Sequence, residues 1–284
     1  MAAIGTTAGN SLIVERVADM LVEPLAAASV ILDAGPRIID SSEPVRVPTL
    51  ATAFDPAWVG ENELIPEVAT TFGELELMPT SRKSIKSIVR VSNELIRMAT
   101  RGVSQTLQTR LVTDVRDKLD TALLNGEGVD GDGDPDGTVT GLVHTPGALT
   151  GDFDAEDPDS VLDAVADMAA AEITPTVLYM NGADFFTMRK VKDTTGRALI
   201  QPDVTQGARF TLHGIPVRVS SKVAEGAPVL VDMSKVVVVR DLAPAVDILT
   251  ERYAEYDQTG IRVRARYDIG VLHPSAVLVM SSGE

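Results

Sequence analysis

The sequence predicts an α+β protein with aliphatic cores. Apolar and polar residues alternate with a period of two in parts of 45–92 and again at 258–280, as they do in strands that cover a core on one face. A stripe of apolar residues repeats every four positions from Leu107 to Leu123, which is typical of a long amphipathic helix. Between these regions, helical and strand patterns alternate. Because 44% of the residues are hydrophobic and only 4% are aromatic, the cores must consist mainly of Val, Leu, Ile and Ala.

Length, charge and cysteine content exclude several classes of protein. The 284 residues can form one large domain or two ordinary ones. No window reaches the roughly 18 consecutive apolar residues of a membrane span, and the N-terminus lacks the basic and apolar regions of a signal peptide. The absence of cysteine excludes disulfides and thiolate metal sites. The formal net charge of −16 argues against a protein that holds nucleic acid through its phosphates.

The first 80 residues predict an arm, a short helix and a long hairpin. Residues 1–12 are small and polar, and residues 11–25 place apolar side chains on one side of a helix that a proline interrupts. Residues 45–50 predict a strand, and a second extended arm ends in alternating glutamates and leucines at 74–77. Joined around 68–70, the two arms form a hairpin. Since an isolated hairpin is marginally stable in water, we expect it to lie on a surface that its sequence neighbours do not provide.

The next residues predict a strand followed by two helices. Residues 84–92 alternate apolar and polar side chains, and residues 93–101 can form a short helix. A second helix, capped by Ser104 and ending near Leu124, is about six turns long. We call it the spine helix. On its polar side, Asp114 and Lys118 stand four residues apart in the order that favours an ion pair.

The remaining sequence predicts alternating elements and then strands. A helix begins at the Asp157-Pro158 pair, because aspartate is favoured as the cap and proline in the first turn. The run 175–181 is almost entirely apolar, as in a strand buried on both faces. The further elements expected are a helix over 183–191, strands over 209–221, 227–233 and 235–241, and two strands within 258–280 with Pro274 at the turn between them.

Few residues are arranged for chemistry. His144, His213 and His273 are isolated from one another, so no pair of them has the spacing of a zinc site. The sequence contains neither the nucleophile elbow of a hydrolase nor the glycine-rich loops that bind dinucleotides or phosphates. We therefore predict no catalytic residues, no bound cofactor and no metal site.

The glycine-rich run at 121–137 has some features of a calcium loop. Asp132, Asp134, Asp136 and Gly137 fit the first, third, fifth and sixth positions of such a loop. The twelfth position needs a bidentate glutamate and is Val143. We therefore interpret the run as a solvated connector whose glycines let the chain turn sharply after a helix.

Three arginines line one face of a predicted strand. Arg262, Arg264 and Arg266 alternate with apolar residues, so their guanidinium groups point to the same side. On a nucleic-acid-binding protein they would form a row of phosphate contacts. In so acidic a chain, we expect them to pair with carboxylates of the same or a neighbouring subunit.

The order of these segments carries a resemblance to a known family. The segments are VSNELIRMA before the spine helix, LDTALLNGEG at its end, TGLV after the connector, VLYMNGADFFTMRKVKDTTGRALIQP, LHGIPVRVSS and the terminal RVRARYDIGVLHPSAVLVM. Together they resemble the major capsid proteins of tailed bacteriophages, of the Hong Kong ninety-seven type, from about Leu12 to Met280. The resemblance implies an N-terminal arm and short helix (1–44), an extended loop formed by the hairpin (45–80), a peripheral domain with the spine helix (81–142 and 236–284) and an axial domain (143–235).

The resemblance implies a structural protein and not an enzyme. Subunits of this type self-assemble as pentamers and hexamers into an icosahedral shell, which encloses double-stranded DNA without sequence-specific binding and without a membrane. The implied partners are copies of the chain itself, with portal and decoration proteins as further candidates. Because Met1 stands close to the arm, we expect the scaffolding protein to be either absent or a separate chain, unless the sequence is that of an edited mature form. The implied location is the virion capsid, assembled in the host cytoplasm.

Two alternatives are kept open. An encapsulin-type nanocompartment has the same fold and encloses cargo enzymes, and the size and content of its particles would distinguish it from a phage head. An α+β hydrolase with an acidic site would need two convergent carboxylates with perturbed pKa values in a pocket, and the sequence does not single out such a pair.

The resemblance also bears on contacts between subunits. In the type member, a lysine–asparagine isopeptide bond links subunits, but here Asn62 stands in the place of the lysine, Asp257 near the asparagine and Arg264 near a catalytic glutamate. We therefore expect no covalent crosslinks. We expect the hairpin's apolar residues to be buried mainly against an adjacent subunit and its glutamates to meet basic groups there or face solvent. The candidate contact residues are Trp58, Glu61, Glu63, Leu64, Ile65, Glu67, Phe72, Glu74, Leu75, Glu76, Leu77, Arg82, Lys83, Lys86, Arg262, Arg264 and Arg266.

Overall fold

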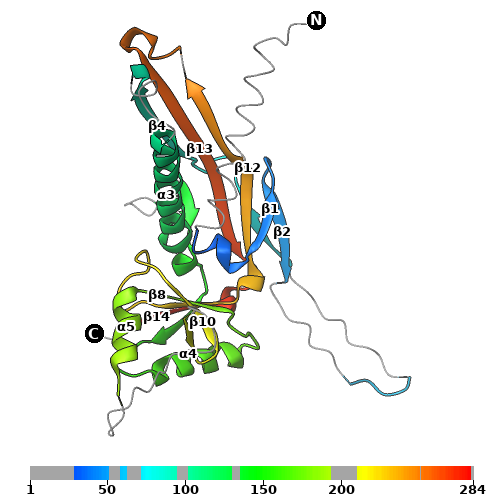
Figure 1. Cartoon of the computed structure of the whole chain (residues 1–284). Coiled ribbons are helices and arrows are strands. Elements are labelled where there is room, and N and C mark those ends of the chain that lie inside the picture. The colour runs from blue at the N-terminus through cyan, green and yellow to red at the C-terminus, as the bar shows by residue number, and fades with distance from the viewer. Residues whose placement is uncertain are drawn as a thin grey trace, which may run out of the picture.

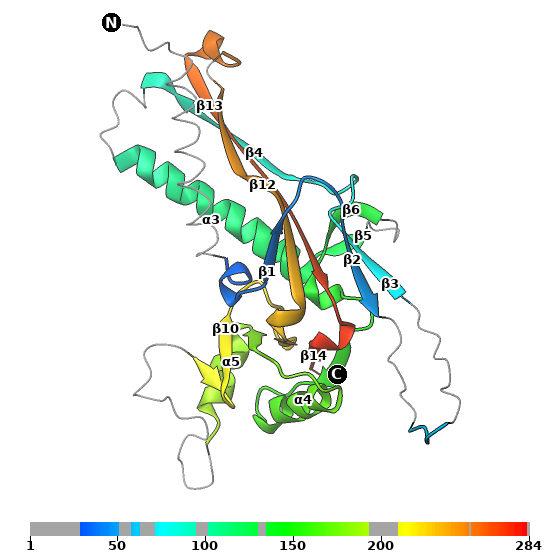
Figure 2. The same cartoon turned by 90° about the vertical axis from the view of Figure 1, so that its right-hand side faces the viewer.

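The described residues form a four-stranded and a six-stranded β-sheet, each with helical cover on one face, and two further two-stranded sheets (Figures 1 and 2). The computed structural model describes residues 29–50, 58–62, 72–94, 102–129, 135–192, 210–249 and 251–282. In these residues, strands and helices are mixed in the manner of the α+β class expected from the sequence. The helix predicted over 11–25, most of the one predicted over 93–101 and the hairpin reversal at 68–70 lie outside the described residues.

Helix α3 (Gly102–Asn125) is the predicted spine helix, and it begins two residues before the expected cap at Ser104. The buried members of its apolar stripe are Leu111, Val112, Val115, Leu119 and Leu123. Asp114 pairs with Arg110, at 3.0 Å, and not with Lys118 as the sequence analysis expects. An exposed ion pair of this kind contributes little to stability, so the burial of the stripe holds the helix in place.

The four-stranded sheet contains the two longest strands, and helix α3 lies along it (Figure 1). The sheet consists, in order, of β1 (Arg37–Asp40), β12 (Val236–Leu249), β13 (Gln258–Val271) and β4 (Ile85–Ser92). β1 is parallel to β12, and the other neighbours are antiparallel. One face shares an apolar cluster with α3, to which β13 contributes Val263 and Ala265 and β4 contributes Ile85 and Val89. We call the opposite side the outer face.

The predicted hairpin is confirmed at its base. β2 (Val45–Leu50) and β3 (Phe72–Leu77) pair antiparallel, with Val45 opposite Leu77. The base lies on the outer face of the four-stranded sheet, where Leu77 and Met78 form a small apolar cluster with Val237 and Val239 of β12. The surface that the hairpin needs is therefore provided in part by its own chain.

The second sheet has six strands and two covering helices. It consists, in order, of β7 (Leu149–Asp152), β14 (Val277–Ser281), β11 (Val229–Val231), β8 (Val177–Met180), β10 (Ile215–Val219) and β9 (Thr211–Leu212). Helices α4 (Asp159–Ala170) and α5 (Gly182–Lys190) share one apolar cluster on the same face. The other face joins the core beneath α3. All four residues of β8 are buried, as predicted for a strand covered on both faces.

Strand β14 corrects the predicted grouping of the C-terminus. The family resemblance places 236–284 in the peripheral domain, but β14 pairs with β7 and β11 in the six-stranded sheet. Likewise, β1 lies in the region predicted as an arm and pairs with β12. Both pairings join segments far apart in sequence, and a local pattern does not reveal such partners.

The remaining elements are short. The connector after α3 folds back as a two-stranded ribbon of β5 (Glu127–Val129) and β6 (Pro135–Thr140). The 3₁₀ turns are η1 (Leu32–Ala34), η2 (Leu142–His144), η3 (Met233–Lys235), η4 (Ala254–Tyr256) and η5 (Pro274–Ala276). Among the described residues, no helix has the length and apolar composition needed to span a bilayer.

Candidate subunit-contact surface

The predicted contact residues of the hairpin divide into an exposed tip and a packed base. At the tip, Trp58 is 104% exposed and Glu61 is also exposed. On β3, Glu74 and Glu76 are exposed, and Glu74 lies 3.8 Å from Arg46 on the paired strand. The candidates Glu63, Leu64, Ile65 and Glu67 lie outside the described residues, as does the side chain of Phe72.

Leu77 is already covered within its own chain, and Leu75 is partly covered there. Leu77 is 2% exposed in the single chain, and Leu75 packs against the same cluster. Both side chains lie over Gly270 of β13, where a Cβ atom would stand only 2.5 Å from a methyl group of Leu77. The absence of a side chain at Gly270 thus lets the hairpin base approach the sheet closely.

Arg82 belongs to the base of the hairpin and not to a free contact surface. Its guanidinium lies 3.0 Å from the carboxylate of Asp268, whose side chain is fully buried. The same carboxylate accepts hydrogen bonds from the backbone N–H of Met78, at 2.6 Å, and of Ile269, at 3.0 Å. Arg82 also donates to the carbonyl oxygen of Thr138. A buried charge held by so many partners fixes the point at which the chain leaves β3.

Lys83 is likewise engaged within its own chain. Its ammonium group lies 3.4 Å from Asp136, in the connector ribbon. Asp136 also accepts a hydrogen bond from the backbone N–H of Thr138, at 2.6 Å. The hydrogen bonds from Thr138, and secondarily the charge of Lys83, hold the pKa of Asp136 below its usual range. Of the three aspartates that match the calcium-loop pattern, Asp136 is therefore used in local contacts, while Asp132 and Asp134 lie outside the described residues.

The arginine row pairs with carboxylates of its own chain, which is one of the two pairings expected. Asp247 of β12 lies 2.8 Å from Arg262 and 3.1 Å from Arg264. Arg266 lies 3.3 Å from Asp241 and donates to the carbonyl oxygen of Pro79, at 2.8 Å. Arg266 therefore helps to hold the hairpin base, whereas Arg262 and Arg264 share a single carboxylate and remain partly exposed.

Lys86 lies directly across from Arg264 in the pairing of β4 with β13. Ile88 lies across from Arg262, and Arg90 across from Gly260, with the Arg90 guanidinium 5.3 Å from the ring centre of Tyr253. Directly opposed residues of antiparallel strands point to the same side, so these side chains extend the outer face beyond the hairpin base. We call Lys86, Ile88, Arg90, Asp247, Arg262 and Arg264 the basic face. The sequence analysis missed Ile88 and Arg90, although the alternation of β4 already places Arg90 on the side of Lys86.

The three positions aligned with the isopeptide bond of the type member are Asn62, Asp257 and Arg264, and none of them is the lysine that such a bond needs. Asn62 and Asp257 both adopt positive φ, at 69° and 49°, which is typical of tight turns. The carboxylate of Asp257 accepts a hydrogen bond from the side-chain amide of Asn93, at 2.7 Å. Arg264 pairs with Asp247.

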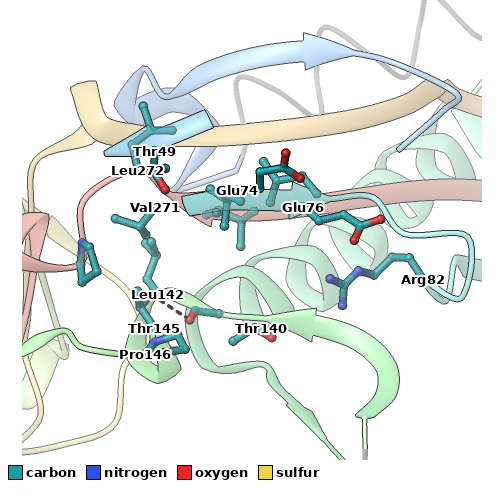
Figure 3. A pocket seen from close by; sticks show the side chains of 16 residues that line it. Thr49, Glu74, Glu76, Arg82, Thr140, Leu142, Thr145, Pro146, Val271 and Leu272 are labelled. Atoms are coloured by element: carbon teal, nitrogen blue, oxygen red, sulfur yellow. Dashed lines mark hydrogen bonds between the residues drawn. The ribbon is translucent and has the colours of Figure 1, made fainter. Parts of the chain in front are cut away.

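One cavity of about 370 Å³ lies between the hairpin base and turn η2 (Figure 3). Leu142, Val271 and Leu272 contribute aliphatic walls, and Glu74 and Glu76 lie along it. The two glutamates are exposed neighbours on one strand and do not converge from different elements. This arrangement does not supply the acid–base pair that the hydrolase alternative requires. Nor do the described residues contain a cluster of three histidine or acidic side chains able to hold a metal ion.

Comparison with known proteins identifies a family. The model described as the phage capsid family matches residues 9–282. Among solved structures, the chain is similar to one titled "Mycobacterium phage Adephagia", with 18% identity, a TM-score of 0.71 and 90% of each chain covered. For "Microbacterium phage Oxtober96" the values are 20% and 0.71, covering 90% of this chain and 91% of that one. For "Capsid of empty GTA particle computed with C5 symmetry" they are 17% and 0.70, covering 90% of each chain. No curated protein matches the sequence. The structural matches show a fold shared over nearly the whole chain.

Proposed function

The chain belongs to the phage capsid family, and we propose that it is the major capsid protein of a tailed phage. In this proposal, it self-assembles as pentamers and hexamers into an icosahedral shell that encloses double-stranded DNA. The family match over residues 9–282 carries the proposal. The net charge of −16 supports it, because an acidic container repels the polyanion packed inside it.

The hairpin supplies a physical reason for assembly. Its base is fixed on its own sheet by the cluster of Leu77 and Met78, but its tip carries a Trp58 side chain that touches nothing in the described chain. A fully exposed tryptophan is costly to leave in water and is among the side chains that contribute most to interfaces. We propose that the tip of the hairpin, which carries the exposed Trp58 and Glu61, lies against an adjacent subunit.

Electron microscopy of the purified protein and of the virions tests the function. We expect closed icosahedral particles, with large DNA-filled heads in the virion. Small shells filled with protein would support the encapsulin-type alternative. A soluble chain that forms no particle under any condition, and is absent from virions, would contradict the capsid function.

A deletion tests the role of the hairpin. Removing residues 55–70, which keeps the paired strands β2 and β3, and joining the flanking segments should leave a folded subunit that no longer closes into shells. Circular dichroism and thermal melting report on the fold, and sedimentation reports on assembly. Normal assembly of the deleted chain would show that the hairpin is not needed between subunits.

A further inference from the structure

Short turns connect the two parts of the molecule. We call α3, the four-stranded sheet and the ribbon of β5 and β6 the spine part. Within the described residues, the chain passes between the spine part and the six-stranded sheet at η2, η3 and η5, each a 3₁₀ turn of 3 residues. The segments of η3 and η5 are hydrogen-bonded to each other, because the backbone N–H of Asp232 donates to the carbonyl oxygen of Ala276 and that of Leu272 to Lys235, both at 2.9 Å. η2 contacts β13 and β14, the two strands that η5 joins. Adjacent turns of a few residues can act together as a hinge.

Strand β10 and the loop after it connect the six-stranded sheet to α3 outside this hinge. Arg218 of β10 forms an ion pair with Asp33 of η1 and also donates to the carbonyl oxygen of that residue, at 3.4 Å. In the loop, the carbonyl oxygen of Lys222 accepts a hydrogen bond from the side-chain amide of Asn125, the last residue of α3. The Lys222 ammonium lies 3.9 Å from Asp117, also on α3. We call these contacts of Arg218 and Lys222 the latch.

Turn η1, which carries Asp33, is itself fixed to α3. Asp120 of α3 is buried and accepts hydrogen bonds from the hydroxyl of Ser29, at 2.5 Å, and from the backbone N–H of Val30, at 3.2 Å. The side chain of Ile31 is fully buried in the core that α3 covers. Figure 2 shows η1 next to β10. Both sides of the latch therefore hold the six-stranded sheet to the same helix.

The loop of the latch is also fixed to its own sheet. The side-chain amide of Asn181, the cap of α5, donates to the carbonyl oxygen of Val223, at 2.8 Å. The backbone N–H of Ser220 donates to the carbonyl oxygen of Met180, at 3.0 Å. The adjacent carbonyl oxygens of residues 222 and 223 are thus held by asparagines from the two parts of the molecule. A loop fixed in this way moves with its sheet, so the latch fixes the angle about the hinge.

The latch is weaker than the cores on either side of it. The Arg218 side chain is 38% exposed and that of Asp33 is 46% exposed, and an exposed ion pair contributes little to stability. A single hydrogen bond to a carbonyl oxygen also makes only a modest net contribution. In the part of the chain that the structure describes, every ion pair between the spine part and the six-stranded sheet belongs to the latch. The latch can therefore open while both sheets stay folded.

We propose that the latch sets the angle between the spine part and the six-stranded sheet, and through this angle the curvature of the shell; the proposal rests on the shell function above. Arg218 and Asn125 are then positioning residues for assembly. Neighbouring subunits of a closed assembly are related by fixed rotations, so a change of angle inside one subunit changes the rotation at which the next is added. Pentamers and hexamers need the same chain at different angles. A hinge with a preferred angle and a weak latch favours one radius and yields where the shell bends more sharply.

The distance between two labels measures this angle. The chain contains no cysteine, so Lys118→Cys on α3 and Asp163→Cys on α4 give one labelled pair, and both positions are exposed. In the unassembled chain, electron–electron double resonance should give one narrow distribution of distances. D33R, R218D and N125D should each widen it by about twofold or more, because a joint with fewer contacts samples more angles. N125D keeps the size of the side chain and removes its N–H donor.

Controls separate the latch from general destabilisation. D33R/R218D restores the ion pair with the charges exchanged and should return the narrow distribution. E156R makes the same charge change as D33R on an exposed residue outside the latch and should leave the distribution unchanged. V239A, in the buried cluster under the hairpin base, should lower the melting temperature without widening the distribution. The latch is overturned if its three single variants leave the distribution unchanged, if D33R/R218D does not recover it, or if V239A widens it equally.

Electron microscopy of assembled shells tests the link to curvature. The unmodified chain and D33R/R218D should form shells of one diameter, whereas R218D and N125D should form a wider range of diameters or shells that do not close. If the unmodified chain forms no shells while the label distances respond as expected, the shell function fails and the latch stands. If the distances respond but R218D and N125D form shells of the unchanged diameter, the latch does not set the curvature and the proposal is overturned.

Discussion

Replacing Asp268 by alanine should be among the most damaging single substitutions in this chain. The Asp268 side chain is fully buried and lies 3.0 Å from the guanidinium of Arg82, whose own side chain is 13% exposed. It also accepts the backbone N–H groups of Met78 and Ile269. The substitution leaves a largely buried cation and two N–H groups without their acceptor.

The expected loss follows from these contacts. Removing one partner of a buried ion pair costs about 3–5 kcal/mol, and a buried N–H without an acceptor costs about 1–3 kcal/mol. The terms overlap, because water entering the cavity can satisfy some of the freed groups. We therefore expect the free energy of unfolding to fall by about 4 kcal/mol, which is a large part of the roughly 5–15 kcal/mol of a typical domain.

Urea denaturation of the unassembled subunit measures this loss. Glu74→Ala is the matched control, because it removes the acidic partner of Arg46 from an exposed pair with a separation of 3.8 Å. An exposed pair of this kind is worth about 0–1 kcal/mol. Asp268→Asn, which keeps the size and one acceptor, should lie between the two. If D268A costs no more than E74A, the buried ion pair does not hold the hairpin base and the reasoning fails.

Three further outcomes are expected. Asp120 of α3 is buried and accepts hydrogen bonds from the hydroxyl of Ser29 and the backbone N–H of Val30. Burial raises the pKa of Asp120 above its ordinary value of 3.8, so its contribution to stability is complete below that value and is lost as the pH rises through the raised pKa. Asp120→Asn should flatten this decline in urea denaturation curves, and an unchanged pH profile would contradict it. Residues 125–140 should bind no structural calcium, and a site tighter than about 10⁻⁵ M in calorimetric titration would overturn this. Mature shells should dissociate to monomers in hot detergent because Asn62 and Arg264 replace the groups a crosslink needs, whereas a ladder of covalent oligomers on a denaturing gel would reveal a different linkage.

The spacing of apolar residues predicted the elements that bury one face along their whole length. The apolar stripe of α3 and the alternation in β3, β4 and β13 gave each element within a few residues. The strand expected over 235–241 continues to Leu249, past Pro244, in a part of β12 that pairs with β13 alone. The structure accommodates the proline at a register shift between Asp241 and Ala245, where the ladder is interrupted and no N–H is needed.

Strand partners were beyond the reach of pattern alone. β1 has only four residues, and its parallel partner begins about two hundred positions later, at Val236. For the same reason, β14 could be recognised as a strand but not assigned to the six-stranded sheet. Asp268 was also missed, since one aspartate in an acidic chain has no distinguishing signal until the fold brings Arg82 to it.

The basic residues proposed for contact separate into two groups once their partners are known. Arg82 and Arg266 act at the hairpin base, through Asp268 and the carbonyl oxygen of Pro79, and both retain a buried Nε that has no hydrogen-bond partner among the described residues. Lys86 and Arg264 lie farther along the same outer face, where they oppose each other in the exposed part. The first group orients the hairpin as it leaves its own sheet, and the second remains at least partly exposed on the part of the outer face beyond the hairpin base.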